Sequence, residues 1–407
     1  MNVKNRTLFI ADNLDIMRGI DSETIDLIYL DPPFNTKKEW KAPIGSPAEG
    51  AEFKDIWTDE DVKDGWYSEI AESYPYIHQI IQAAEHTYDH SMMIYLMAMG
   101  IRLIEMKRIL KPKGSIYLHC DPTASHYLKL VLDDIFEKKN YQSEIIWGYR
   151  TQGVSKSAWP KKHDVILHYG GGQKPTFHPQ MQRLIYQKPF RHTKTDEEGN
   201  YYADVYVRDV WDDDPETKAL ISQAKERTGY PTQKPLALLD RIIKASSNEG
   251  DMVLDPFCGC ATACVASEKL RRQWIGIDIS PAAEIITKLR LEEASAQGSL
   301  FTPIQMSDVT VSRIPPQRTD PHDPKQEKLP NYKVHKNYLY GIQEGFCKIC
   351  KNHYLIKDLT VDHIIPRSKK GTDHPKNLQL LCHNCNSTKG NRTEEYAIQR
   401  LKEKEII

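Results

Sequence analysis

Residues 25–34 read IDLIYLDPPF, an apolar run that stops at two consecutive prolines. The first six residues are mostly isoleucine, leucine and tyrosine, so they predict a buried strand over residues 25–30. Proline lacks the N–H that a central strand donates, and the chain must therefore leave the sheet at Pro32 and Pro33. Asp31 and Phe34 are consequently placed at a strand end, a common position for residues that carry chemistry.

The segments on both sides of this run alternate between predicted strands and predicted helices. Residues 35–90 are polar and aromatic, and they predict a long loop or a partly helical insertion. The residues Lys-Pro-Lys-Gly at 111–114 are expected to separate a helix from the strand that follows. Strands that alternate with helices are typical of an α/β fold with a mostly parallel sheet. Further strands are predicted over residues 7–11, 115–119, 145–149, 165–169, 252–254 and 274–278, and helices over 91–110, 128–136, 236–245 and 262–270.

A second motif, DPFCG at residues 255–259, follows another predicted strand. A loop of small residues after a strand lets a nucleotide-like ligand approach the backbone closely. Asp278 ends the next predicted strand, where a carboxylate can bind ribose hydroxyls. Taken alone, these residues indicate either a nucleotide-binding loop or an ordinary turn.

The motif at 31–34 suits the chemistry of a base amino group, whose lone pair is delocalised into the ring. A carboxylate and a backbone carbonyl could accept the two N–H groups, so that the lone pair points at a methyl donor. Asp31 would supply the carboxylate and Pro32 the carbonyl, while Pro33 stiffens the turn and Phe34 stacks on the extruded base. Because Asp-Pro also opens many ordinary turns, the motif alone leaves both interpretations open.

Taken together, the motifs resemble those of the circularly permuted (beta-class) DNA amino-methyltransferases, over residues 5–295. The resemblance rests on DPPF at 31–34, KPKG at 111–114, YPTQKP at 230–235, DPFCG at 255–259 and GID at 276–278. It implies a Rossmann-like, mixed seven-stranded sheet with helices on both faces, and S-adenosylmethionine as the cofactor. It implies catalytic roles for Asp31, Pro32, Pro33 and Phe34. It assigns cofactor contacts to Asp12 at the adenine, to Gln233, Lys234 and Pro235 at the methionine end, to Asp278 at the ribose, and to Asp255, Pro256, Phe257 and Gly259 in the loop.

One position departs from that family, which usually has glycine where this chain has Ala261. Alanine disfavours a positive φ angle, so we expect a slightly altered loop with binding retained. The nearby Cys258, Cys260 and Cys264 are expected to be small buried residues and not metal ligands.

The methylated atom is predicted to be N6 of adenine. In the resembling family, an initial Asp in the catalytic motif is typical of adenine enzymes and an initial Ser of enzymes that methylate N4 of cytosine, with exceptions. Methylation at carbon 5 of cytosine is disfavoured because it needs a cysteine nucleophile, usually after proline, and the chain has no Pro-Cys dipeptide. Residues 150–227 mix basic and aromatic side chains and form a candidate target-recognition region, although an ordinary polar insertion would look similar.

Four further cysteines form two C-x-x-C pairs, Cys347 with Cys350 and Cys382 with Cys385. The chain has no secretory signal pattern, so this spacing favours a structural zinc site over disulfides. Between the pairs lie Val-Asp-His-Ile-Ile-Pro at 361–366 and Asn-Leu-Gln-Leu-Leu at 377–381, and Asn-Ser-Thr-Lys-Gly at 386–390 follows the last cysteine. The pattern over residues 338–393 resembles the cysteine-stapled HNH endonucleases and implies a small zinc-bound ββα domain.

The HNH resemblance assigns roles to four residues. His363 would be the general base, and Asn377 would orient the backbone or the His363 ring. Asp362 and Asn386 would hold one Mg²⁺ or Mn²⁺ ion, because hard cations prefer oxygen ligands. Many family members have His at the position of Asn386, so this is an H-N-N variant. The alternative to an active nuclease is a degenerate module that only binds DNA.

These patterns predict three segments: a methyltransferase domain over 1–295, a proline-rich linker over 296–333 and an HNH-like zinc domain over 334–407. Residues 331–407 carry 14 basic and 8 acidic residues, while the remainder carries 41 basic and 48 acidic. Double-stranded DNA is the expected partner, and a homodimer is left open. Without a signal peptide or a membrane-spanning stretch, the expected compartment is the cytoplasm. The favoured activity is an adenine-N6 DNA methyltransferase with HNH endonuclease activity, conceivable as a one-chain restriction–modification enzyme. The alternative is a cytosine-N4 methyltransferase with a non-catalytic DNA-binding module.

Overall fold

The computed structural model describes residues 2–404 except 64, 150–154, 213–217, 221–223, 225, 297, 299–305, 321–335 and 370–376. Most of the predicted linker therefore lies outside the described residues. The chain folds into two compact units. The first unit comprises Met1–Trp66 and Gln79–Asp320, and the second comprises Tyr67–His78 and Pro321–Ile407.

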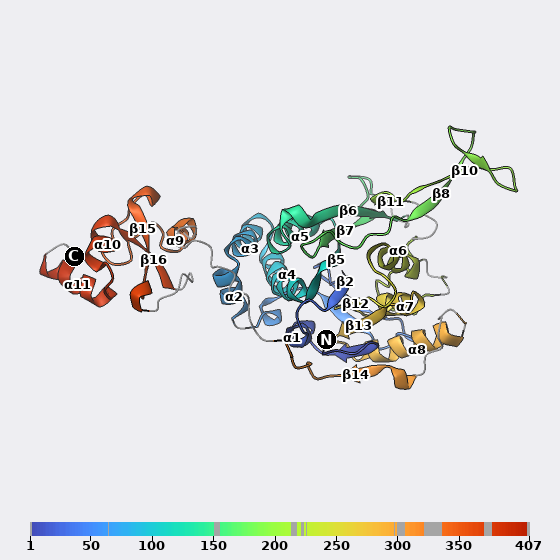
Figure 1. Ribbon diagram of the computed structural model, residues 1–407, viewed down its shortest axis with the longest axis horizontal. Coiled ribbons are helices and arrows are strands. Elements are labelled where there is room, and N and C mark those ends of the chain that lie inside the picture. Colours follow the sequence, from blue (N-terminus) through green and yellow to red (C-terminus); the bar gives the residue numbers. More distant parts are fainter. Residues whose placement is uncertain are drawn as a thin grey trace. The chain divides into compact units, whose positions relative to one another are not determined.

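The first unit is built on a mixed sheet with the strand order β11-β6-β7-β5-β2-β12-β13-β1-β14 (Figure 1). All neighbouring pairs are parallel except those of β7, which runs antiparallel to both β5 and β6. The prediction of a mixed α/β sheet is confirmed. The strands are β1 (Thr7–Ile10), β2 (Ile25–Leu30), β5 (Leu110–Cys120), β6 (Tyr141–Gly148), β7 (His163–Gly170), β11 (Val210–Trp211), β12 (Met252–Asp255), β13 (Gln273–Asp278) and β14 (Thr310–Ser312).

The predicted number of seven strands is not confirmed, because the sheet has nine strands within the described residues. The two additional strands are β11 and β14, which have two and three residues and lie at the two edges. Strands this short carry no hydrophobic periodicity of their own, and β14 falls inside the segment that was predicted to be a linker.

The Lys-Pro-Lys-Gly segment does not lie outside the sheet, contrary to the sequence prediction. Strand β5 begins at Leu110, and its register against β2 shifts from Ile25↔Leu110 to Leu27↔Ser115. Residues 111–114 therefore form a bulge within the strand, where proline is tolerated. The carbonyls of Pro112 and Gly114 accept hydrogen bonds from backbone N–H groups of the 171–173 loop, which compensates for the interrupted ladder.

Helices cover both faces of this sheet (Figure 1). On one face, α4 (His90–Ile109) packs between α1 (Asn13–Gly19) and α5 (Ser125–Ile135). On the other face, α7 (Thr262–Lys269) packs between α6 (Leu236–Ser246) and α8 (Ala282–Ala296). The core between α6, α7 and the central strands is apolar and includes Leu239, Ile243 and Val253. No described helix has the length and apolar character needed to cross a lipid bilayer.

The insertion at 35–90 contains more regular structure than the sequence predicted. It begins with an antiparallel hairpin of β3 (Lys38–Lys41) and β4 (Glu52–Asp55). A short 3₁₀ helix, η1 (Asp59–Asp61), and the helices α2 (Trp66–Ser73) and α3 (Pro75–Thr87) follow in the chain. A separate sheet in the order β8-β10-β9 lies between β7 and α6 in the sequence. Its strands are β8 (Met181–Tyr186), β9 (Lys194–Thr195) and β10 (Tyr201–Tyr206).

The second unit contains the antiparallel pair β15 (Leu359–His363) and β16 (Leu378–Cys382), followed directly by α10 (His383–Lys389). This is the predicted arrangement of two strands and a helix. The helices α9 (Lys336–Ile342) and α11 (Glu394–Glu403) complete a small core that includes Leu380, Leu381 and Leu401.

Candidate functional site

Four acidic residues meet at the carboxyl edge of the central sheet. Asp12 follows β1, Asp31 follows β2, and Asp255 and Asp278 end β12 and β13. These four strands are parallel neighbours, so their ends open on one edge, at the point where ligands bind in open α/β sheets. Together they line a cavity of about 550 Å³. Of the residues predicted for catalysis and cofactor binding in this unit, all line the cavity except Pro235, which caps α6.

Asp31 forms a bidentate ion pair with Lys234, which the sequence did not predict. The Lys234 Nζ donates to both carboxylate oxygens, at 2.8 and 2.6 Å. The two side chains are 19% and 9% exposed, so little water competes with the pair. The same ammonium lies 5.2 Å from the centroid of the Phe34 ring. Lys234 therefore contacts both side chains that were predicted to capture the base.

Phe34 rests on a buried polar network that sequence reasoning missed. Its ring stacks on His119, with centroids 5.9 Å apart and planes inclined by 24°. His119 shares a hydrogen bond of 2.9 Å with the hydroxyl of Tyr29 and one of 3.1 Å with the carboxylate of Asp164. Burial alone would raise the pKa of Asp164, but the contact with His119 holds that pKa below its usual value. The sequence feature that could have pointed to His119 is its position at the end of the strand predicted over residues 115–119.

The loop after β12 is held by Asp278. The carboxylate of Asp278 accepts hydrogen bonds of 2.8 Å from the backbone N–H groups of Gly259 and Ser280. Gly259 has a φ of 49°, and a Cβ at this position would lie 2.9 Å from the ring of Tyr230. Glycine is therefore required here both by conformation and by space.

The expectation that Ala261 avoids a positive φ angle is wrong. Ala261 adopts the left-handed conformation, with φ 58° and ψ 34°, that a glycine would adopt more easily. Two backbone hydrogen bonds hold it there, because its N–H donates to Cys258 and its carbonyl accepts from Val265 at the start of α7. The helix start thus imposes the conformation, and the alanine carries the strain.

Two carboxyl groups of the cavity, those of Asp255 and Asp278, lie in surroundings that disfavour their charged form. Burial raises the pKa values of Asp255 and Asp278, and the neighbouring carboxylates Asp31 and Asp278 raise that of Asp255 further. A positive charge between these groups would offset the cost of ionising them. Asp12 differs: burial would raise its pKa, but Arg102, at 3.2 Å, and the N–H of Leu14 hold the pKa below its usual value.

Gln233 uses its side chain within its own segment. Its Oε1 accepts hydrogen bonds from the N–H and hydroxyl of Thr228, both 2.9 Å, and its Nε2 donates to the carbonyl of Glu226 at 2.7 Å. These bonds close the turn that precedes Lys234.

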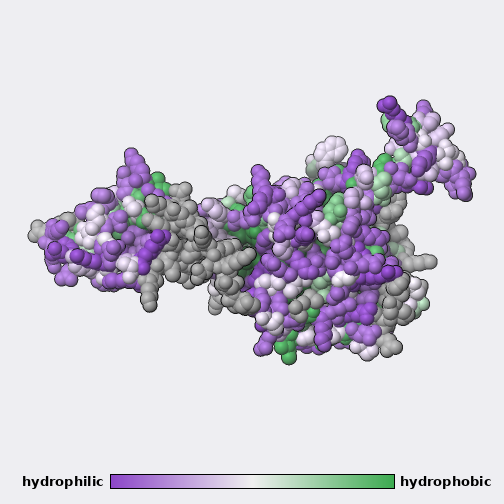
Figure 2. All heavy atoms as spheres, in the orientation of Figure 1, coloured by the Kyte–Doolittle hydropathy of each residue, from purple (hydrophilic) through white to green (hydrophobic). Residues whose placement is uncertain are grey.

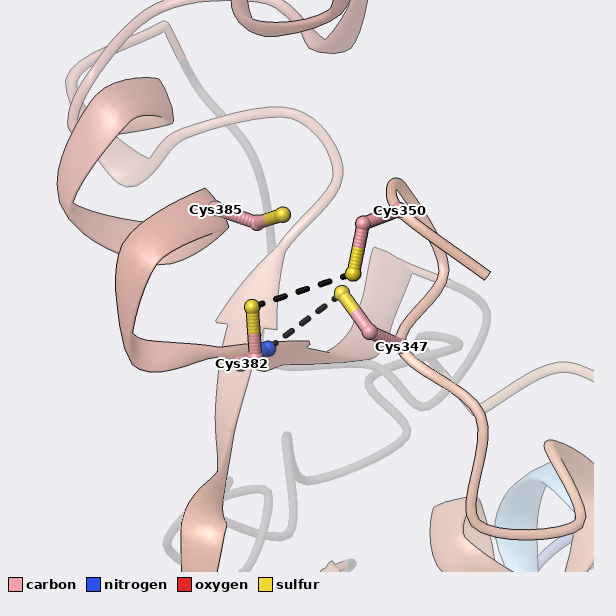
Figure 3. Close-up of side chains that lie close together, drawn as sticks. All are labelled: Cys347, Cys350, Cys382 and Cys385. Atoms are coloured by element: carbon pink, nitrogen blue, oxygen red, sulfur yellow. Dashed lines mark hydrogen bonds between the residues drawn. The ribbon is translucent and has the colours of Figure 1, made fainter. Parts of the chain in front are cut away.

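In the second unit the four predicted cysteines come together (Figure 3). Their sulfur atoms all lie within 4.8 Å of one another, with 3.9 Å between Cys350 and Cys382. A tetrahedral zinc with Zn–S bonds of about 2.3 Å needs sulfur–sulfur distances of roughly 3.8 Å. Burial raises the pKa values of Cys347 and Cys385, a cost that a divalent cation would remove. The cluster fits zinc, as predicted.

The predicted HNH residues lie on three adjoining elements of the same unit. Asp362 and His363 end β15, Asn377 precedes β16, and Asn386 lies on α10, which packs against β15. Asn377 ties down the chain after the strand, since its side-chain amide bonds both the N–H and the carbonyl of Ile365, at 2.8 and 2.9 Å. Of the two predicted roles for Asn377, this geometry matches the orientation of the backbone.

Lys389 is a part of this centre that sequence reasoning missed. Its side chain is fully buried, and its Nζ lies 2.9 Å from the Oδ2 of Asp362 and 2.7 Å from the carbonyl of His363. Gln379 donates to the same Oδ2 at 3.2 Å. The sequence feature that could have pointed to Lys389 is its spacing from Asn386. Lys389 follows Asn386 by three residues, about one helical turn along α10.

The candidate target-recognition region, residues 150–227, is described only in part. Its three-stranded sheet projects from the main body (Figure 1) and carries hydrophilic and hydrophobic side chains side by side (Figure 2). Arg183 lies 3.8 Å over the ring of Tyr202 and pairs with Asp204 at 3.0 Å, while Phe190 is 71% exposed. Such a mixture of cations and aromatic rings fits contact with DNA, but it is equally compatible with a polar surface.

Comparisons with known proteins give two family matches. Residues 25–288, more than half of the chain, match the family described as DNA methylase. Residues 347–392 match the family described as HNH endonuclease. The two matches lie in the two parts of the sequence that carry the motifs described above.

Among individual proteins, the chain is 28% identical over 324 residues to the type II methyltransferase M.HpaI of Haemophilus parainfluenzae, covering 79% of this chain and 83% of that protein. It is also 28% identical over 311 residues to the DNA adenine methyltransferase YhdJ of Escherichia coli K12, covering 71% and 84%. Among solved structures, the putative DNA modification methylase TTHA0409 of Thermus thermophilus, complexed with S-adenosyl-L-methionine, gives a TM-score of 0.40 at 18% identity, over 70% of this chain and 94% of that chain. The cytosine-N4-specific PvuII DNA methyltransferase gives a TM-score of 0.40 at 14% identity, over 76% and 91%. Scores this low carry no structural argument.

Proposed function

Because the chain belongs to the DNA methylase family, we propose that residues 1–295 transfer a methyl group from S-adenosylmethionine to N6 of adenine in double-stranded DNA. One observation carries the proposal: Asp31, Gly259 and Asp278 all line one cavity at adjacent strand ends. The Asp278 carboxylate accepts a hydrogen bond from the N–H of Gly259 there. A base and a nucleotide-like cofactor can therefore meet there.

The cavity residues suit this cofactor. Asp278, already bonded to the N–H of Gly259, has lone pairs left to accept from ribose hydroxyls. The buried carboxylates of Asp255 and Asp278 would complement the positive charges of the sulfonium and ammonium groups. When bound, the cofactor supplies an electrophilic methyl group on sulfur. Asp12, Pro256 and Phe257 line the rest of the proposed cofactor site.

At the transfer point, Asp31 and the carbonyl of Pro32 would accept the two N–H groups of the base. This directs the nitrogen lone pair at the methyl carbon, and Phe34 stacks on the extruded ring. Bound there, the cofactor would supply the methyl group to that nitrogen and leave with the electrons of its carbon–sulfur bond. The extra proton on nitrogen then passes to Asp31 or to water.

Adenine is favoured over cytosine by the initial Asp of the motif and by the similarity to YhdJ, whose name states that it is a DNA adenine methyltransferase. Methylation of N4 of cytosine, with a non-catalytic C-terminal module, is the second candidate. Digesting methylated DNA to nucleosides and weighing the products separates the two. N6-methyladenine is expected, and N4-methylcytosine alone would overturn the assignment.

We further propose that residues 334–407 form an HNH endonuclease domain with a structural zinc. His363 would activate water, and Asp362 and Asn386 would hold one Mg²⁺ or Mn²⁺ ion that stabilises the leaving oxygen. The contacts of Asp362 support its role as a metal ligand. Gln379 and Lys389 both donate to its Oδ2, and among the described residues no donor contacts its Oδ1.

The two activities together would make a one-chain restriction–modification enzyme in which methylation blocks cleavage. A nuclease tethered to a methyltransferase meets the same DNA at high effective concentration, so it must be restrained. The sequence has no G-x-x-x-x-G-K-[ST] motif for gating by ATP within the chain. Protection by the methyl group is then the simplest restraint.

The test uses purified protein with Mg²⁺ or Mn²⁺. One substrate is unmodified DNA, and the other is the same DNA methylated to completion by the His363→Ala variant. Cutting of the unmodified DNA alone is expected. Equal cutting of both would reject protection, and cutting of neither would favour the DNA-binding alternative.

A further inference from the structure

Asp31 and Lys234 lie 203 residues apart in the sequence, yet they form the most enclosed ion pair of the cavity. The ammonium faces both oxygens of the carboxylate and also covers the ring of Phe34 at 5.2 Å. Both of the side chains proposed to hold the base, Asp31 and Phe34, are therefore engaged by Lys234. A buried pair of this kind is maintained because each charge would be costly without the other.

This engagement conflicts with the proposed role of Asp31. A carboxylate that already receives two charge-assisted hydrogen bonds is a weaker acceptor for the neutral amino group of a base. Asp31 would be a stronger acceptor for that group if Lys234 moved to another anion. The protein alone offers Lys234 no second carboxylate in direct contact among the described residues.

The proposed cofactor brings such an anion. Its amino-acid carboxylate is joined by a short chain to the sulfur whose methyl group would face the base amino group held by Asp31. Four cations line the cavity, but Lys63 and Arg102 are paired with Asp12, at 3.3 and 3.2 Å, and Lys54 lies exposed on β4. Lys234 is the buried cation that is already next to the transfer point.

We propose that Lys234 is exchanged between the two carboxylates: it pairs with Asp31 in the free protein and with the carboxylate of the bound cofactor. The exchange releases the oxygens of Asp31 and the ring of Phe34 for the base. The inference rests on the proposed function, and it predicts that the cofactor must bind before the base is held. The carboxylates of Asp31 and of the cofactor compete for one ammonium. Removing either carboxylate therefore changes the affinity of Lys234 for the other.

Calorimetric titration of the full chain tests the exchange with two probes. S-adenosylhomocysteine has the amino-acid carboxylate, whereas 5′-methylthioadenosine lacks it. Asp31→Asn removes the competing anion, so we expect about tenfold tighter binding of S-adenosylhomocysteine, within the usual range of coupling between sites. Lys234→Met should weaken it by about tenfold or more, and both variants should leave methylthioadenosine unchanged.

Two further variants keep the test decisive. The double variant Asp31→Asn/Lys234→Met removes both charges together, leaves no unpaired ion, and should bind like Lys234→Met. The matched control Lys54→Met removes an exposed cavity lysine and should bind like the wild type. Unchanged or weaker binding of S-adenosylhomocysteine by Asp31→Asn, or a loss caused by Lys54→Met, would overturn the exchange. Failure of the wild type to bind S-adenosylhomocysteine would instead reject the proposed function, and the exchange with it.

Discussion

The two candidate centres are assembled in opposite ways. In the first unit, Asp12, Asp31, Asp255 and Asp278 come from distant parts of the sequence and meet because four parallel strands end at one edge. In the second unit, the cysteines and the HNH residues all lie between residues 347 and 389. The first site depends on a large fold, whereas the second depends on a local chain segment.

This difference follows from size. The first unit buries an apolar core on both faces of its sheet, which can hold side chains in place without a metal. The core of the second unit is a short set of residues around β15, β16 and α11, and four cysteines belong to it or border it. Small domains of this kind usually need a metal or disulfides for stability. Four substitutions test how strongly each centre depends on its surroundings.

The largest effect is expected from Cys382→Ser, which should remove zinc and unfold the second unit while the first unit stays folded. Structural zinc contributes on the order of 10 kcal/mol to folding in such modules. Elemental analysis and calorimetry should show loss of zinc and of one thermal transition. Cys260→Ser, a buried cysteine of the first unit, is the matched control and should keep its zinc. Wild-type protein without zinc would contradict the assignment.

Asp31→Ala should reduce methyl transfer by about 10³-fold, because removing one preorganised contact at the reacting group typically has this effect. Transfer of a labelled methyl group to DNA measures it, and the zinc content of the second unit should be unchanged. Asp59→Asn, an exposed carboxylate paired with His90, should retain activity. Near wild-type transfer by Asp31→Ala would remove Asp31 from the mechanism.

Asp255→Asn should stabilise the free protein at neutral pH, on the order of 1 kcal/mol as for a typical single substitution. Burial raises the pKa of Asp255 above its unfolded value, so the folded state binds the proton more tightly. Stability is therefore lost as pH rises from the unfolded pKa, about 3.9, through the folded pKa. The amide carries no charge and can still accept from the N–H of Phe257. Melting temperatures against pH should show a flatter profile for the variant, and parallel profiles would contradict the prediction.

The smallest effect is expected from Ala261→Gly, which should raise the free energy of unfolding by about 0.5–1 kcal/mol. Glycine relieves the cost of φ 58°, and part of the gain is offset by the greater entropy of the unfolded chain. Urea denaturation of the first unit measures the change. Ala263→Gly, two residues further in regular helix, should instead lower stability by about 1 kcal/mol. Destabilisation by both would show that the loop is not strained.

Local patterns in the sequence were sufficient for the strands β1, β2, β12 and β13 and for the motifs at their ends. The alternation of apolar runs with helical periods predicted the α/β class, and the C-x-x-C spacing predicted the cysteine cluster. These features depend on near neighbours in the chain, so the sequence expresses them directly.

Contacts between side chains from different strand ends depend on the tertiary structure. The pair of Asp31 with Lys234, the stack of Phe34 on His119 and the burial of Lys389 against Asp362 all join residues from different elements. The left-handed Ala261 is a further case, since the hydrogen bonds at the start of α7 overrule the preference of the residue. Pairings of this kind depend on strand order and packing, and these are set by the burial of the whole core, which no local pattern encodes.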